Sequence, residues 1–172
     1  MATTLSTVLQ ASTVVDTLSG FEAASLTGGN DNDNINASAF TFAVTLQGGG
    51  GNDVLVSGAG NDNLDGQSGD DTLSGGDGDD IVLSGTTSHS STIAALNVIM
   101  AEWASEKLYA TRVTNLQLGG GLNGSTKLNG STIQNDSSAL DSLSGNADQD
   151  VFFWSNPDQI LDAVLNETSV LI

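Results

Sequence analysis

Residues 48–83, GGGGNDVLVSGAGNDNLDGQSGDDTLSGGDGDDIVL, repeat one pattern every nine positions. They divide into four nonapeptides: GGGGNDVLV, SGAGNDNLD, GQSGDDTLS and GGDGDDIVL. The fourth position of each unit is glycine: Gly51, Gly60, Gly69 and Gly78. The sixth is aspartate: Asp53, Asp62, Asp71 and Asp80. The eighth is apolar: Leu55, Leu64, Leu73 and Val82. Three registers that hold together at one period indicate stacked repeats.

Each nonapeptide is expected to form a turn followed by a short strand. The glycine-rich first six residues permit positive φ angles and a tight turn that points carbonyl groups inward. The last three residues place one apolar side chain between two outward-facing ones. A fifth unit, GGNDNDNIN at residues 28–36, keeps Asp33 and Ile35 but has Asp31 at its fourth position. Because no unit can bury its apolar residue alone, the pattern predicts a mainly β solenoid with a thin core of Ile35 and the four eighth-position residues.

The composition points to metal rather than cross-links as the stabilising element. The chain has 172 residues, the length of one domain, with a net charge of −18 and no cysteine. A compact fold with this charge repels itself unless cations neutralise it, and nucleic acid and membrane insertion are not expected. The absence of cysteine excludes disulfides and thiolate sites. Carboxylate and carbonyl oxygens suit Ca²⁺ rather than zinc or copper.

The nonapeptides resemble the RTX family of hemolysin-type calcium-binding repeats, whose consensus is G-G-x-G-x-D-x-U-x. The resemblance implies a parallel β-roll with two nonapeptides per coil and the turns stacked in two columns. The units that start at residues 28, 48 and 66 would share one column, and those at 57 and 75 the other. In the family, each calcium lies between consecutive turns of a column. The first turn supplies its second, fourth and sixth positions, and the next turn its first, third and sixth.

Carried onto this sequence, the resemblance implies three calcium sites in which glycines act through carbonyls and sixth-position aspartates through carboxylates. One site comprises Gly49, Gly51, Asp53, Gly66, Ser68 and Asp71. A second comprises Gly58, Gly60, Asp62, Gly75, Asp77 and Asp80. A third comprises Gly29, Asp31, Asp33, Gly48, Gly50 and Asp53.

The repeat departs from the family pattern in two places. The units at 28 and 48 are 20 residues apart, and residues 37–47 between them are expected to form a longer apolar strand without calcium on that side. After Val82, His89 occupies the next aspartate position, so the ladder is expected to end there. An EF-hand starting at Asp31 is excluded, because Asn36 replaces the required glycine and Phe42 the bidentate glutamate.

We expect four regions along the chain: an N-terminal cap (1–27), the RTX β-roll (28–89), a helical and hairpin-like excursion (90–135), and degenerate repeats with a C-terminal tail (136–172). Apolar residues at helical spacing from Ile93 to Trp103 predict a helix over residues 91–110, with a broken continuation to Leu116 as an option. The helix is expected either to dock on the roll or to bind a partner. A hairpin-like stretch is expected over residues 122–134. This segment is expected to be either an excursion from one continuous roll or a spacer between two rolls.

The repeat returns near the C-terminus as DSSALDSLS (136–144) and GNADQDVFF (145–153). These units align Asp141 and Asp150 with the earlier aspartates as further candidate ligands, with calcium binding left open. The ending NETSVLI is similar to the uncleaved C-terminal signals of type I secretion, and the N-terminus lacks the features of a secretory signal peptide. We therefore expect a protein that is secreted to the extracellular space or the cell surface.

Enzymatic activity is not expected. His89 is the only histidine, and every clustered carboxylate is assigned to a calcium turn. The sequence instead favours a calcium-binding structural protein that self-assembles into a layer, matrix or filament. The N-terminal residues 3–15, rich in β-branched side chains, would pair with another subunit head to tail. The alternative is a folding and secretion module of a larger adhesin or exoenzyme.

Overall fold

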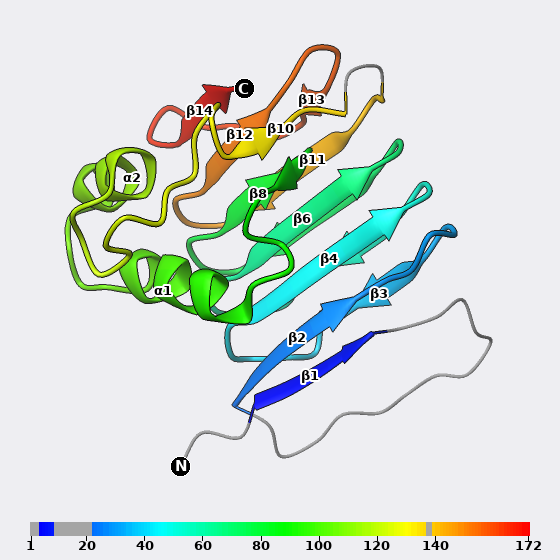
Figure 1. Ribbon diagram of the computed structural model, residues 1–172, viewed down its shortest axis with the longest axis horizontal. Coiled ribbons are helices and arrows are strands. Elements are labelled where there is room, and N and C mark those ends of the chain that lie inside the picture. Colours follow the sequence, from blue (N-terminus) through cyan, green and yellow to red (C-terminus); the bar gives the residue numbers. More distant parts are fainter. Residues whose placement is uncertain (1–3, 9–21, 137–138) are drawn as a thin grey trace.

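The computed structural model describes residues 4–8, 22–136 and 139–172 (Figure 1). The helices are α1 (Ile93–Trp103) and α2 (Tyr109–Leu118). The strands of the N-terminal half are β1 (Thr4–Val8), β2 (Ala23–Thr27), β3 (Asn34–Asn36), β4 (Val44–Gly50), β5 (Val54–Val56), β6 (Asn63–Ser68), β7 (Thr72–Gly76) and β8 (Ile81–Leu83). The later strands are β9 (Thr86–Thr87), β10 (Ile133–Gln134), β11 (Ser142–Asn146), β12 (Val151–Trp154), β13 (Gln159–Ile160) and β14 (Thr168–Leu171).

Two parallel sheets dominate the fold (Figure 1). The seven-stranded sheet has the order β1-β2-β4-β6-β8-β12-β14, and the five-stranded sheet the order β13-β11-β7-β5-β3. From β3 to β8, successive strands alternate between the two sheets, so two nonapeptides complete one coil of the chain. The architecture is mainly β, with parallel sheets and two helices in the described residues, and is consistent with a parallel β-roll.

The core lies between the two sheets and is built from the eighth position of each unit. Leu64 of β6 pairs in register with Leu46 of β4 and with Val82 of β8. Leu55 of β5 pairs in the same way with Leu73 of β7. The predicted core residues are all buried in one cluster, which confirms this prediction: Ile35, Leu55, Leu64, Leu73 and Val82.

The excursion leaves the coil after β8 and returns to the same two sheets. Strand β7 pairs with β11 and β8 with β12, in a register where Thr72 lies beside Ser142 and Ile81 beside Val151. At the base of the excursion, β9 and β10 pair antiparallel. The prediction of a hairpin within residues 122–134 is therefore wrong, because β10 finds its partner in β9. Asn123 instead stabilises turns in this segment, because its Nδ2 donates hydrogen bonds to the carbonyls of Asn115 and Thr126.

The helical region is broken where a single helix over residues 91–110 was predicted. The segment between α1 and α2 is not helical, and Leu108 at the start of α2 has an extended backbone, with φ −56° and ψ 140°. The break brings Trp103 and Tyr109 into edge-to-face contact, with ring centroids 5.7 Å apart. It also brings Lys107 Nζ within 2.6 Å of Glu102 Oε2. These contacts across the break offset the helical hydrogen bonds that are lost.

The helices pack on the outer face of the seven-stranded sheet (Figure 1). A second core forms there between the sheet residues Ile81, Leu83, Val151 and Phe153 and the excursion residues Ile99, Trp103, Val113, Leu116, Leu128 and Ile133. Of the predicted N-terminal cap, residues 1–3 and 9–21 lie outside the described residues, and β1 and β2 extend the seven-stranded sheet. Neither helix found in the described residues has the length and apolar character needed to cross a bilayer.

Candidate calcium-binding turns

The sixth-position aspartates form two columns of hydrogen bonds, which we call the aspartate ladder. In each step, the backbone N–H of one aspartate donates to Oδ1 of the aspartate in the next turn. In the first column the steps are Asp33 to Asp53 (2.8 Å), Asp53 to Asp71 (2.8 Å), Asp71 to Asp141 (2.7 Å) and Asp141 to Asp158 (3.2 Å). In the second column they are Asp62 to Asp80 (2.8 Å) and Asp80 to Asp150 (2.7 Å).

The second carboxylate oxygen of these aspartates has a different environment. In six of them, Oδ2 is buried and has no hydrogen-bond partner in the described part of the chain: Asp53, Asp62, Asp71, Asp80, Asp141 and Asp150. A buried carboxylate oxygen without a partner is costly unless a cation lies beside it. The orphaned oxygens therefore fit the oxygen-only coordination that Ca²⁺ prefers.

The acidity of the ladder carboxyls reflects this burial. In the absence of a bound cation, burial and, to a lesser degree, the neighbouring charges of Asp62 and Asp150 raise the pKa of Asp80 to about 10. Burial likewise raises the pKa of Asp71 to about 8 and that of Asp62 to about 6. The pKa of Asp141 rises to about 7 for the same reason. Burial and mutual repulsion thus disfavour the ionised ladder until a cation compensates its charge.

Left-handed backbone at the second and fourth positions shapes the turns. Gly51 and Gly69, both at the fourth position, have φ angles of 105° and 119°. A side chain at Gly51 would also meet the backbone of Asp31 in the preceding turn. At Gly51, glycine is therefore favoured both by conformation and by the close approach of stacked turns. Asn146 and Asp148 keep positive φ angles at the corresponding positions of the degenerate unit.

Carbonyl groups must supply most of the ligands. Within the described residues, no group of three or more His, Cys, Asp or Glu side chains could hold a metal by itself. The carbonyl of Gly58 accepts a hydrogen bond from Asp77 N at 2.9 Å, which leaves it a second lone pair. The carbonyl of Gly75 accepts a hydrogen bond from the hydroxyl of Ser57. A cation between two turns would thus be shared between carboxylates and backbone oxygens.

The structure brings the residues of the first two predicted sites together. In the first site, β4 and β6 place Gly49 beside Gln67 and Gly50 beside Ser68, and Asp53 is joined to Asp71. In the second, Gly58 and Gly60 pair with Asp77 through the backbone, and Asp62 is joined to Asp80. The side chains of Ser68 and Asp77 are exposed, so these residues face the turns through their backbone.

The third predicted site has a different geometry. Asp33 and Asp53 are adjacent on the ladder, and Gly50 N donates to the carbonyl of Gly29 at 2.9 Å. Asp33 Oδ2, however, accepts a hydrogen bond from Gly29 N at 2.6 Å and is not orphaned. The side chain of Asp31 is exposed. Asp53 therefore contributes the free carboxylate oxygen at this step.

The second column begins where the aspartate is replaced. Val44 stands at the ladder position before Asp62, and its N–H donates to Asp62 Oδ1 at 2.7 Å, so no second carboxylate is present on that side. His89 lies outside the columns, with Nε2 3.0 Å from the carbonyl of Lys127. The prediction that the ladder ends at His89 is wrong, because the first column continues from Asp71 to Asp141 and the second from Asp80 to Asp150.

Sequence reasoning missed a second, outer ladder at the fifth position of the units. Asn52 N donates to Asn32 Oδ1 at 2.8 Å, and Asp70 N donates to Asn52 Oδ1 at 3.2 Å. In the other column, Asp79 N donates to Asn61 Oδ1 at 3.3 Å. The signal is visible in the sequence, because the fifth position of all four regular units is Asn or Asp. These side chains tie consecutive turns together outside the aspartate ladder.

Sequence reasoning also left Asp141 and Asp150 without ladder partners. The structure joins them to Asp71 and Asp80, each 70 residues earlier in the chain. The regular ladder spacing is 18 residues, so a spacing of 70 means that 52 extra residues are inserted between two consecutive nonapeptides. Those residues, 84–135, stand between the unit that ends at Leu83 and the unit that begins at Asp136.

A comparison with known families is in accord with this geometry. Residues 47–82 match the model of the RTX calcium-binding nonapeptide repeat in four copies. No curated protein matches the chain, and no solved structure matches it. The chain therefore contains RTX calcium-binding repeats, and Ca²⁺ is the ion that it binds.

Proposed function

We propose that this chain is a non-catalytic structural module of the cell exterior, a β-roll solenoid whose folding depends on calcium. The observation that carries the proposal is the set of six buried, orphaned Oδ2 atoms on the aspartate ladder. Without a cation, these carboxylates repel one another around a core to which most strands contribute one apolar residue. Extracellular calcium modules typically bind at about 10⁻⁴–10⁻³ M, so the protein would fold on leaving a calcium-poor compartment.

The proposed ions lie between consecutive turns of each column. We assign them to the steps Asp33–Asp53, Asp53–Asp71 and Asp62–Asp80, with the glycine carbonyls named above. In the steps Asp71–Asp141 and Asp80–Asp150, both aspartates likewise have an orphaned Oδ2 atom. We therefore assign an ion to each of these steps as well. The step at Asp33 is expected to be the weakest, because one partner carboxylate is already hydrogen bonded.

The test is a calcium titration of metal-stripped protein followed by far-ultraviolet circular dichroism. The β signal is expected to appear with calcium and to disappear with chelator, while magnesium at the same concentration leaves it weak, because Mg²⁺ is smaller and demands near-ideal octahedral geometry. A β spectrum that is the same with and without calcium would contradict the proposal. Native mass spectrometry then counts the bound ions.

Secretion is proposed on two grounds. RTX repeats are typical of secreted bacterial proteins, and the C-terminal residues 166–172 are similar to type I secretion signals. Co-expression with a type I exporter tests this directly: the protein is expected in the medium, and a variant lacking residues 166–172 inside the cells. Retention of the intact chain in the cells would argue against this route.

Self-assembly is proposed from the sheet edges. Within the described residues, β1 and β14 are the outermost strands of the seven-stranded sheet, each with one neighbour. Unpaired parallel edges at opposite ends permit head-to-tail association, and calcium would relieve the repulsion between copies of charge −18. Light scattering in millimolar calcium should show assembly that a variant lacking residues 1–15 has lost. Monomers of both proteins would instead favour the alternative, a folding and secretion module of a larger exoprotein.

A further inference from the structure

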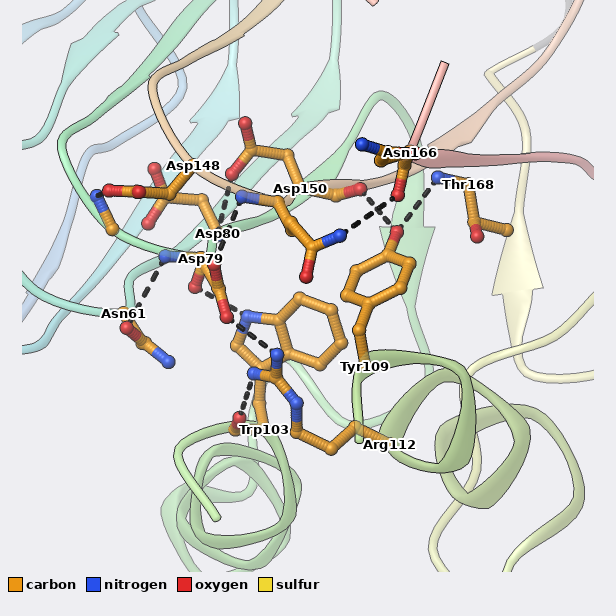
Figure 2. A network of polar contacts seen from close by, with 12 residues as sticks. Asn61, Asp79, Asp80, Trp103, Tyr109, Arg112, Asp148, Asp150, Asn166 and Thr168 are labelled. Carbon is orange, nitrogen blue, oxygen red and sulfur yellow. Dashed lines mark hydrogen bonds and ion pairs between the residues drawn. The ribbon is translucent and has the colours of Figure 1, made fainter. Parts of the chain in front are cut away.

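The helical excursion contacts the roll through the two turns that face each other across the step from Asp80 to Asp150 (Figure 2). Trp103 Nε1 donates a hydrogen bond to the carbonyl of Asp79 at 2.5 Å. Tyr109 OH donates to the carbonyl of Asp150 at 2.6 Å. One contact is made to each turn, so α1 and α2 hold both sides of a single ladder step.

A buried cation completes this contact. Arg112 Nη2 lies 2.5 Å from Asp79 Oδ2, and Arg112 Nη1 donates to the carbonyl of Trp103 at 2.7 Å. The guanidinium carbon stands 4.6 Å from the centroid of the Trp103 ring. Of the two ion pairs in the described residues, this is the one that joins the excursion to the roll. Arg112 thus offsets one negative charge beside the crowded carboxylates of Asp80 and Asp150.

Asp79 is the point where several turns meet. Its Oδ1 accepts a hydrogen bond from Gln149 N at 2.9 Å, and its own N–H donates to Asn61 Oδ1 at 3.3 Å (Figure 2). With Arg112 on Oδ2, this one side chain and its backbone connect three successive turns of the column to α2. Fixing Asp79 therefore fixes the backbone on both sides of the step.

The excursion has an internal polar centre of its own. The fully buried carboxylate of Glu102 accepts from Lys107 Nζ (2.6 Å), from Asn115 Nδ2 (2.7 Å) and from Leu122 N (2.6 Å). These donors come from the segment between the helices, from α2 and from the loop after it. The two helices are thus joined to each other independently of the roll, and they dock on the turns as a unit.

We propose that this helical unit is a clamp that couples its own docking to calcium binding at the step from Asp80 to Asp150. The inference rests on the proposed function, in which a calcium ion lies between these two turns. The docked clamp fixes both turns in the arrangement that would hold the ion, so docking raises the affinity of this step. Coupling is reciprocal, so calcium at this step stabilises the docked helices by the same factor.

The two tryptophans of the chain allow docking to be measured separately from folding. In a Trp154→Phe background, Trp103 is the only tryptophan, and its emission reports contact with Asp79. Calcium is expected to shift this emission to the blue, with the same midpoint as the β signal in circular dichroism. Arg112→Met is expected to raise the calcium midpoint by about fivefold or more, the lower end of typical couplings.

Lys127→Met is the matched control, because it removes the same charge from the same excursion and has no ion pair in the described structure. Its calcium midpoint is expected to stay at that of the parent. Tyr109→Phe removes only the hydroxyl that bridges Asp150 O and Thr168 N, and it keeps the test available if Arg112→Met does not fold. It is expected to raise the midpoint in the same direction.

Two results would overturn the clamp. One is a Trp103 emission that does not respond while calcium folds the sheets. The other is a calcium midpoint in Arg112→Met or Tyr109→Phe equal to that of Lys127→Met. Failure of the proposed function has a different signature, in which no variant, including the parent, changes its circular dichroism with calcium.

Discussion

Asp71 and Asp141 are adjacent on the aspartate ladder although 70 residues separate them, with Asp71 N 2.7 Å from Asp141 Oδ1. Their hydrogen bond has the same geometry as that between Asp53 and Asp71, which are 18 residues apart. The coil therefore continues across the insertion of residues 84–135 as though those residues were absent. Stacked repeats permit this, because each coil contacts only its neighbours.

Removing residues 84–135 should leave a shorter protein that still folds with calcium. The deletion joins Leu83 to Asp136 and restores the uninterrupted nine-residue register. It also uncovers the outer apolar residues, so Ile81, Leu83, Val151 and Phe153 are replaced by threonine. The expected result is a protein with a calcium-dependent β spectrum in circular dichroism. Absence of a β signal at saturating calcium would show that the insertion is needed to build the coil.

Asp71→Asn should weaken calcium-dependent folding much more than Asp31→Asn. Asp71 is buried, and its orphaned Oδ2 belongs to two ladder steps, whereas the side chain of Asp31 is exposed. Removing one charged ligand is expected to raise the calcium midpoint about tenfold or more, since ligand charge sets affinity in such sites. Asp31→Asn should leave the midpoint near that of the parent. Equal midpoints for both variants would mean that the ladder does not hold the ions.

The ion-free protein should become more stable as the pH falls from 8 to 5. Burial raises the pKa of Asp80 to about 10 and that of Asp71 to about 8, well above the unfolded value near 4. Between the unfolded and folded pKa values, the folded state binds more protons, so its stability is lost as the pH rises through this window. Metal-stripped protein should therefore show more β signal at pH 5 than at pH 8.

The same carboxyls provide the control for this pH effect. Asp80→Asn removes the group with the most strongly raised pKa, so the stability of the ion-free variant should depend less steeply on pH than that of the parent. Because protons and calcium compete for the same oxygens, the calcium midpoint of the parent should rise as the pH falls. An identical pH dependence in Asp80→Asn and the parent would assign the effect to other groups.

Leu64→Ala should destabilise the calcium-loaded protein by about 2–5 kcal/mol, the usual cost of truncating a buried leucine. Leu64 is fully buried between its neighbours Leu46 and Val82 in the centre of the seven-stranded sheet. Leu165 is fully exposed, and Leu165→Ala is the matched control with no expected change. Urea unfolding at saturating calcium measures both. A small effect at Leu64 would mean that the ions, rather than the core, dominate stability.

The repeat made much of the fold predictable. The nine-residue period places the strands, puts the eighth-position residue in the core and stacks the turns in two columns, as Leu55 and Leu73 illustrate. The pattern succeeds because a period-two strand with a single apolar residue allows one orientation only. The steps from Asp71 to Asp141 and from Asp80 to Asp150 were not predictable. The ladder spacing of 18 residues becomes visible there only when the inserted residues 84–135 are left out of the count.

The face of the roll on which the helices dock was not predicted, although the sequence carries a signal for it. In unit 57–65, the residues beside Leu64 are the polar Asn63 and Asp65, whereas in unit 75–83 the residues beside Val82 are Ile81 and Leu83. A strand that is apolar on both faces must be covered on both. The break between α1 and α2 depends instead on contacts such as Lys107 with Glu102, which no local pattern specifies.

The antiparallel pair of β9 and β10 makes this point of the coil a natural insertion site for another sequence. Thr86 pairs with Gln134 and Thr87 with Ile133, so the chain leaves and re-enters within one strand spacing, about 5 Å. Any domain whose own termini lie that close could be spliced in at this neck without altering the nine-residue register on either side. A calcium-folded scaffold with such an insertion site would display the inserted domain on one side of the roll, and a chelator would remove the rigid base that holds it.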